Sequence, residues 1–163
     1  MPSQTTMDIS DDEVRLACFK SFPFFAENFC KIVDKDGKLI PFVLNDAQRQ
    51  LNGVIERQLS ERGKVRLVIL KARQQGFSTY FQAWVYWYCA FRSHKKAFLI
   101  AQHAKTTGAL FDMLKRTHIE MHPKLKPRER YSSKLELVFG DLDTTIKVAT
   151  AAGKDFGRGE TTH

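Results

Sequence analysis

The expected fold depends on the stretch VRLVILKARQQGFST, residues 65–79. Its first part, Val65 to Leu70, is apolar and rich in β-branched residues, which predicts a buried strand. The second part is a polar loop with one glycine and two cations, and it ends on two hydroxyl residues. An aromatic-rich, mostly apolar stretch follows and predicts a helix over 78–92 that is buried on more than one side.

A strand, a glycine loop and a helix in this order are the layout of a phosphate-binding P-loop. Backbone N–H groups of such a loop wrap the phosphates, the helix N-terminus adds positive potential, and a hydroxyl ligates Mg²⁺. The usual pattern is G-x-x-x-x-G-K-[ST]. Here Gly76 and Ser78 fit, whereas Lys71 takes the first glycine position and Phe77 takes the lysine position. The charge missing at Phe77 reappears at Lys71 and Arg73, so phosphate binding remains chemically possible.

The alternative interpretation of this loop is an ordinary strand-to-helix turn. Its two cations would then be solvated, and its hydroxyl residues would cap the helix. The loop alone leaves both interpretations open, because a motif match is a hypothesis that its structural context must support.

The loop resembles the P-loop of the large terminase subunits of tailed bacteriophages, the ATPases that pump DNA into the capsid. Many of that family carry an early lysine, in runs such as K-x-R-Q-x-G-x-S/T, and residues 71–79 (KARQQGFST) are similar. Residues 42–51 (FVLNDAQRQL) are similar to the adenine-recognition segment of the family. Residues 157–163 (GRGETTH) resemble the R-G-x-x-x-H run before its Walker B strand. The resemblance covers roughly residues 30–163.

The resemblance implies a set of ATP-binding residues. Cations of the loop would neutralise the β- and γ-phosphates, and residues 75–78 would offer backbone N–H groups. Ser78 would ligate Mg²⁺, Thr79 would cap the helix nearby, and Gln48 would read adenine through its side-chain amide. For Gln48, a helix-capping role is a further and compatible interpretation. The full expected set is Gln48, Lys71, Ala72, Arg73, Gln74, Gln75, Gly76, Phe77, Ser78 and Thr79.

Catalysis in such an ATPase needs further groups. Arg158 lies between two glycines and is our candidate for an arginine finger that reaches a neighbouring subunit's γ-phosphate; a DNA or intramolecular contact is the alternative. An acidic Walker B strand must also supply an Asp for Mg²⁺ and a Glu for the attacking water. In the family it would begin shortly after His163. The nearest candidate within the chain, Leu137 to Asp141, leads into a predicted hairpin turn instead. We therefore expect an N-terminal part of the ATPase, without Walker B and the nuclease domain.

Composition agrees with an ordered domain that meets an anionic partner. The chain has 163 residues, 43% of them hydrophobic, and 13 phenylalanines, which is enough for one sizeable core. The formal net charge of +8 fits a nucleotide or a DNA backbone, although a solvated basic surface is the alternative for any one cluster. Cys18, Cys30 and Cys89 lack C-x-x-C spacing and are expected to be buried, reduced thiols. The histidines show no metal-ligand spacing, so we expect no structural zinc.

Local signals predict the order of the elements. Residues 1–33 form an N-terminal helical segment, helical over 11–33 and broken near Pro23, and residues 34–163 form the first part of the ATPase domain. We expect a β-hairpin over 31–42 that turns at Asp36-Gly37, and a helix from Asn45 to about Arg62 with Gln48 in a capping box. Strands are expected at 65–70, 96–101, 135–139 and 145–149, helices at 78–92 and 105–121, and a basic loop around Pro123 and Pro127. The resemblance implies an incomplete P-loop NTPase (ASCE/RecA-like), a three-layer α/β sandwich with a mostly parallel central sheet.

These expectations define a function and two alternatives. The resemblance implies an ATPase that uses ATP and Mg²⁺ to move double-stranded DNA, with a portal protein, a small terminase subunit and further copies in a ring as partners. Its place would be the cytoplasm of the infected bacterial host; the polar N-terminus is no signal peptide and no run is long enough to span a membrane. The alternatives are another nucleic-acid motor, such as a helicase-like ATPase, and a non-catalytic nucleotide- or DNA-binding fragment. Phe77 argues against the helicase-like class, which usually keeps lysine beside the loop glycine.

Overall fold

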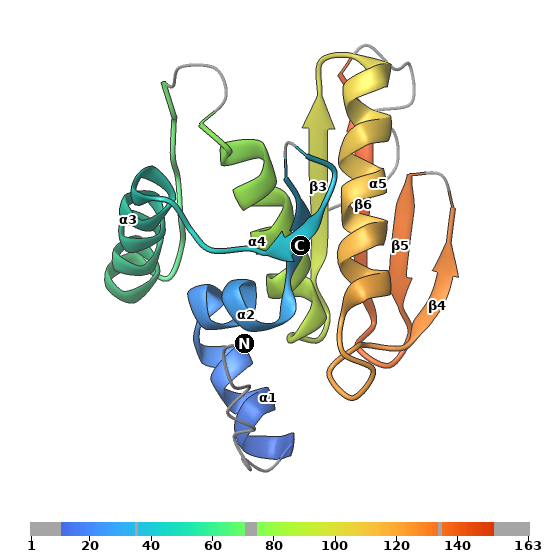
Figure 1. Cartoon of the computed structure of the whole chain (residues 1–163), viewed down its shortest axis with the longest axis horizontal. Coiled ribbons are helices and arrows are strands. Elements are labelled where there is room, and N and C mark those ends of the chain that lie inside the picture. Colours follow the sequence, from blue (N-terminus) through green and yellow to red (C-terminus); the bar gives the residue numbers. More distant parts are fainter. Residues whose placement is uncertain (1–10, 35, 71–74, 134, 152–163) are drawn as a thin grey trace.

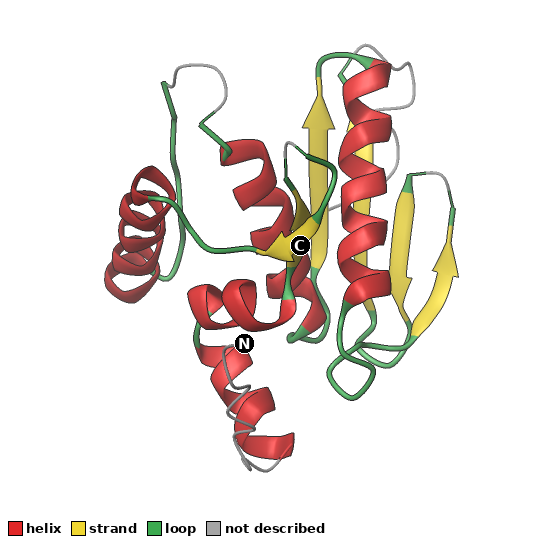
Figure 2. Cartoon of the chain, viewed as in Figure 1, coloured by secondary structure: helices red, strands yellow, loops and turns green. Residues whose placement is uncertain are grey.

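The computed structural model describes residues 11–34, 36–70, 75–133 and 135–151, and it is an α/β fold (Figure 1). The elements in chain order are α1 (Asp11–Lys20), α2 (Phe22–Phe29), β1 (Lys31–Val33), β2 (Leu39–Pro41), α3 (Asp46–Arg62), α4 (Phe77–Ala90), β3 (Lys96–Ala101), α5 (Ala104–Glu120), β4 (Glu129–Ser132), β5 (Glu136–Phe139) and β6 (Thr144–Thr150). Figure 2 shows α4 and α5 side by side against the larger sheet, and Figure 1 shows α3 on the outer side of α4.

The larger sheet has the strand order β3-β6-β5-β4. Only β3 and β6 pair in parallel, whereas β6, β5 and β4 pair antiparallel. The expectation of a mostly parallel sheet is therefore wrong for the described residues. The reason is local: a turn at residues 140–143 joins β5 to β6 as a hairpin, which forces antiparallel pairing. Strand β4 was not predicted; the expected basic loop around Pro123 and Pro127 lies just before it.

One face of this sheet carries the core. Leu137 pairs with Ile146, and Leu99 pairs with Val148, so these four side chains share the face on which α4 and α5 pack. Leu137 and Ile146 are fully buried. On the opposite face of β3, Phe98 and Ile100 remain 39% and 53% exposed. The sheet is thus covered by helices on one side along β3.

The predicted strand at 65–70 is an extended segment without a partner strand among the described residues. Val65, Leu67 and Ile69 pack against the core, and the alternate residues Val68 and Leu70 are fully exposed. This alternation is that of a strand covered on one face. The strand prediction is wrong in its pairing, because a strand needs a neighbouring strand for its backbone N–H and C=O groups and none of the described strands pairs with this segment.

Several local predictions are confirmed. β1 and β2 form the expected antiparallel hairpin, and Gly37 in its turn has φ +80°. The N-terminal helix is interrupted at Ser21, whose hydroxyl accepts a hydrogen bond from Phe24 N–H, and Pro23 sits in the first turn of α2. The three cysteines are buried and free. No helix of the described chain combines the length and the apolar content that crossing a bilayer requires.

Helix α4 is the centre of the packing. Its Tyr80 and Tyr86 are completely buried, which confirms core as the role of its aromatic residues. At its end, Arg92 lies over the rings of Phe19, Trp87 and Tyr88 at 4.5, 4.5 and 4.6 Å, and burial lowers the pKa of its guanidinium. Its Nη2 also donates to the carbonyl oxygen of Phe19 at 3.2 Å. Arg92 therefore joins α4 to α1 by cation–π contacts instead of adding to an open basic surface.

Candidate nucleotide-binding site

The described part of the predicted loop begins at Gln75, while Lys71 to Gln74 and Arg158 lie outside the described residues. Gly76 is the N-cap of α4, with φ 70° and ψ 11°, in the left-handed region that favours glycine. No side chain caps the helix. The expected capping role of Thr79 is therefore wrong: the helix already begins at Phe77, which places Thr79 and the exposed Ser78 in its first turn.

An uncapped helix start of this kind is suited to an anion. The first N–H groups of a helix have no intrahelical partner, and the helix dipole adds positive potential there. The N–H of Tyr80 makes the first helical bond, to the carbonyl oxygen of Gly76 at 3.0 Å. The end of α4 next to Gly76 can therefore receive an oxyanion through backbone donors.

The side chain of Gln48, in α3, is hydrogen-bonded to the glycine turn that precedes α4. Its Nε2 donates to the carbonyl oxygen of Gly76 at 2.9 Å, and its Oε1 accepts from the N–H of Asn45 at 3.0 Å. Asn45 Oδ1 in turn accepts from Gln48 N–H at 2.9 Å, so the predicted capping box is confirmed. Both polar atoms of this buried amide are therefore engaged in the described structure. The adenine contact of Gln48 stays a prediction.

A second contact ties the same two helices together. Tyr80 Oη donates to Asn52 Oδ1 at 2.8 Å, and Asn52 Nδ2 donates to Glu56 Oε1 at 2.8 Å. Burial, with the Glu56 carboxylate adding to it, raises the pKa of Tyr80, so its hydroxyl remains a donor. This pair was not predicted from the sequence. A signal existed, because Asn52 lies four residues after Gln48 and Tyr80 four after Gly76, which places each pair on one helix face.

The Tyr80→Phe variant should lose about 1–3 kcal/mol of unfolding free energy, because it leaves the Asn52 carbonyl oxygen buried without its donor. Urea denaturation measures the change. Tyr88→Phe on the same helix is the matched control, since no hydrogen bond of the Tyr88 hydroxyl is found among the described residues. Equal stability of the two variants would contradict a role for the Tyr80–Asn52 bond in joining α3 to α4.

A hollow of about 210 Å³ lies next to Ser78, between the extended segment and β3. Most of its lining is apolar: Ile69, Phe77, Phe81, Leu99 and Leu110, with Ser78 and Gln82 as the polar members. It would suit apolar side chains better than phosphates. The described residues contain no group of three His, Cys, Asp or Glu that could hold a metal, so Ser78 as a Mg²⁺ ligand stays a prediction.

Comparison with known proteins supports the fold. No protein-family model matches the sequence, and no curated protein matches it either. Among solved structures, the chain is similar to the crystal structure of the HK97 bacteriophage large terminase, with a TM-score of 0.65 and 17% identity. The match covers 89% of this chain and 28% of that chain. At this identity the likeness concerns the fold alone: the described chain has a terminase-like α/β fold, and it spans just over a quarter of the length of that terminase.

Proposed function

We propose that this chain is the ATP-binding part of a viral DNA-packaging motor of the large terminase type. In the whole protein, hydrolysis of ATP with Mg²⁺ would drive double-stranded DNA into a procapsid. Portal protein, small terminase subunit and further copies of the chain would be its partners. The observation that carries the proposal is the uncapped glycine turn before α4, held by Gln48 within a terminase-like fold.

The proposed roles of the loop residues follow from their chemistry. Lys71 and Arg73 would neutralise the phosphates, and the first N–H groups of α4 would add backbone donors. Ser78, exposed in the first turn, would ligate Mg²⁺. Arg158 would act on the γ-phosphate of a neighbouring copy. The formal net charge of +8 supports an anionic partner for the domain as a whole.

Binding of a fluorescent ATP analogue with Mg²⁺ tests the proposal. We expect saturable binding that weakens tenfold or more in Lys71→Ala, about 1.4 kcal/mol, because the variant removes one of the two cations proposed to neutralise the phosphates. Lys64→Ala, which removes an exposed lysine just beyond α3, is the matched control and should bind as the unaltered chain does. Equal binding by Lys71→Ala, or no binding by the unaltered chain, would contradict a nucleotide site at this loop.

A further inference from the structure

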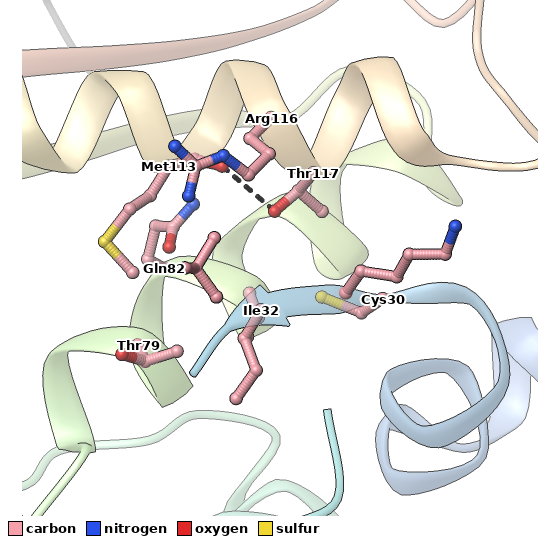
Figure 3. Close-up of a pocket in the computed structure, with 10 residues that line it drawn as sticks. Cys30, Ile32, Thr79, Gln82, Met113, Arg116 and Thr117 are labelled. Carbon is pink, nitrogen blue, oxygen red and sulfur yellow. Dashed lines mark hydrogen bonds between the residues drawn. The ribbon is translucent and has the colours of Figure 1, made fainter. Parts of the chain in front are cut away.

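A pocket lies between β1, α4 and α5 (Figure 3), and of the described residues in the expected ATP-binding set only Thr79 lines it. Its volume is about 210 Å³. Its polar lining includes Lys31, Thr79, Gln82 and Arg116, and no acidic residue lines it. Lys31 Nζ lies 3.4 Å from Glu120 Oε2, so its charge is partly offset, and Arg116 is the main cation.

Gln82 is the unusual member of this lining. Its residue is only 2% exposed, and its Nε2 is buried without a hydrogen-bond partner. A buried donor without an acceptor costs about 1–3 kcal/mol, which is why nearly all such groups in folded proteins are paired. An acceptor that enters the pocket would remove this cost. Gln82 thus points to a ligand, and that ligand must accept hydrogen bonds.

Arg116, a cation in the pocket lining, indicates that the ligand is negatively charged. Figure 3 shows its side chain extending from α5 toward the amide of Gln82 on α4. Among the described residues Arg116 makes no ion pair. Cys30, at the other end of the pocket, adds no negative charge, because burial raises the pKa of its thiol to about 12. The side-chain donors of Gln82 on α4 and of Arg116 on α5 therefore line the same pocket, and no acidic side chain lines it.

We propose that this pocket binds a phosphate group, held by Gln82 Nε2 and the Arg116 guanidinium with the Thr79 hydroxyl nearby. Guanidinium groups pair with phosphate oxygens bidentately, and a tetrahedral oxyanion can meet donors from two helices at once. The size agrees: the pocket volume of about 210 Å³ is below the roughly 300 Å³ at which pockets for whole small-molecule ligands begin. The phosphate can come from free inorganic phosphate or from a DNA backbone.

Calorimetric titration with inorganic phosphate at constant ionic strength is the test. It is done in the Lys71→Ala background, so that the predicted nucleotide loop contributes little. We expect binding that weakens tenfold or more in Gln82→Met and in Arg116→Gln. Lys105→Gln, which removes an exposed cation from the same helix α5, should leave the binding unchanged. A short DNA duplex that competes with phosphate would identify the DNA backbone as the source, and absence of competition would identify the free ion.

The thermal stability without phosphate gives an independent readout. Gln82→Met removes the unpaired amide while filling similar space, so its melting temperature should equal or exceed that of the unaltered chain. A lower melting temperature would show that the amide already has a partner and would overturn the proposal. Equal phosphate binding by the Gln82 variant, no phosphate binding, or acetate binding as tight as phosphate would overturn it as well.

Discussion

The Gly76→Ala variant should lose most of its binding to an ATP analogue and roughly 2–4 kcal/mol of unfolding free energy. The first part of the cost is conformational. Gly76 has φ +70°, and a residue with a Cβ in the left-handed region costs about 1–2 kcal/mol. The backbone of the helix start would then shift, and with it the N–H groups that the proposed function assigns to phosphate.

The second part of the cost comes from Gln48. An ideal Cβ on Gly76 would lie 2.8 Å from Gln48 Nε2, closer than such contacts allow. A side-chain end can usually move away, but this amide is fixed at both atoms, to Gly76 and to the capping box of α3. Moving it breaks hydrogen bonds worth about 0.5–1.5 kcal/mol each and loosens α3 from the loop.

The Gly63→Ala variant distinguishes the conformational cost of a Cβ at positive φ from the steric cost at Gln48. Gly63 ends α3 with φ +64°, nearly the same backbone conformation, and nothing lies within 4 Å of its ideal Cβ. It should therefore show the conformational cost alone and keep its nucleotide binding. Adding Gln48→Ala to Gly76→Ala should recover the steric part of the loss, which a double-mutant cycle measures. Equal losses in Gly76→Ala and Gly63→Ala would contradict the Gln48 contact as the reason for glycine.

The elements predicted well are those whose signals are local. Asn45 and Gln48 form a capping box because both partners lie within one turn of chain. The hairpin at Gly37 and the helix break before Pro23 depend on backbone preferences of single residues. Strand β3 was placed at its observed bounds because a short apolar run before a polar segment has few other interpretations.

Pairing of strands was not predictable to the same degree. Residues 65–70 have the alternation of a strand, yet the described chain gives them no neighbour, and their backbone partners cannot be read from their own sequence. β4 was missed because Glu129 to Ser132 are polar and mostly exposed, and they become a strand only by pairing with β5. Strand pairing depends on tertiary contacts, so the sequence pattern of a strand predicts its extended conformation but not the strand that pairs with it.

In the candidate site, too, the local features were predictable from the sequence and the long-range contacts were not. The glycine position and the helix after it followed from the motif, whereas the contacts that hold the turn did not. Asn52 and Tyr80 meet across two helices 28 residues apart in sequence, and Gln82 lines a pocket made by three elements. A polar residue within a predicted helix gives no sign of burial until its neighbours are known. His118 belongs to this group as well, since its burial was not predicted from the sequence.

His118 should make the stability of the protein depend on pH below neutrality. Its side chain is 6% exposed, with Nδ1 2.9 Å from Tyr86 Oη and Nε2 3.4 Å from Glu129 Oε2. A carboxylate can only accept, so Nε2–H faces Glu129 and Nδ1 accepts from the Tyr86 hydroxyl. Its ring stacks on Phe139 at 5.4 Å. Despite the nearby carboxylate, burial lowers the pKa of His118 from 6.5 to about 4, with the charge of Lys126 adding to the effect.

The direction of the pH effect follows from that pKa. In the unfolded chain His118 binds a proton below about pH 6.5, whereas in the folded chain it stays neutral down to about pH 4. Between these values the unfolded state holds more protons, so the unfolding free energy falls as the pH falls. The contribution of His118 is complete above pH 6.5, and its loss should reach roughly 2–3 kcal/mol near pH 4.5.

Urea denaturation of the unaltered chain and of His118→Gln, each from pH 7.5 to 4.5, isolates this contribution. The variant lowers stability at pH 7.5 by losing ring packing, but its stability should fall less steeply with acid. The exposed His94, His103 and His122 remain in both proteins, so they do not account for a difference between the two profiles. Parallel pH profiles would contradict a buried neutral imidazole at position 118. A stability advantage of the unaltered chain that narrows as the pH falls would show that one residue at the α5–sheet interface makes folding sensitive to acid.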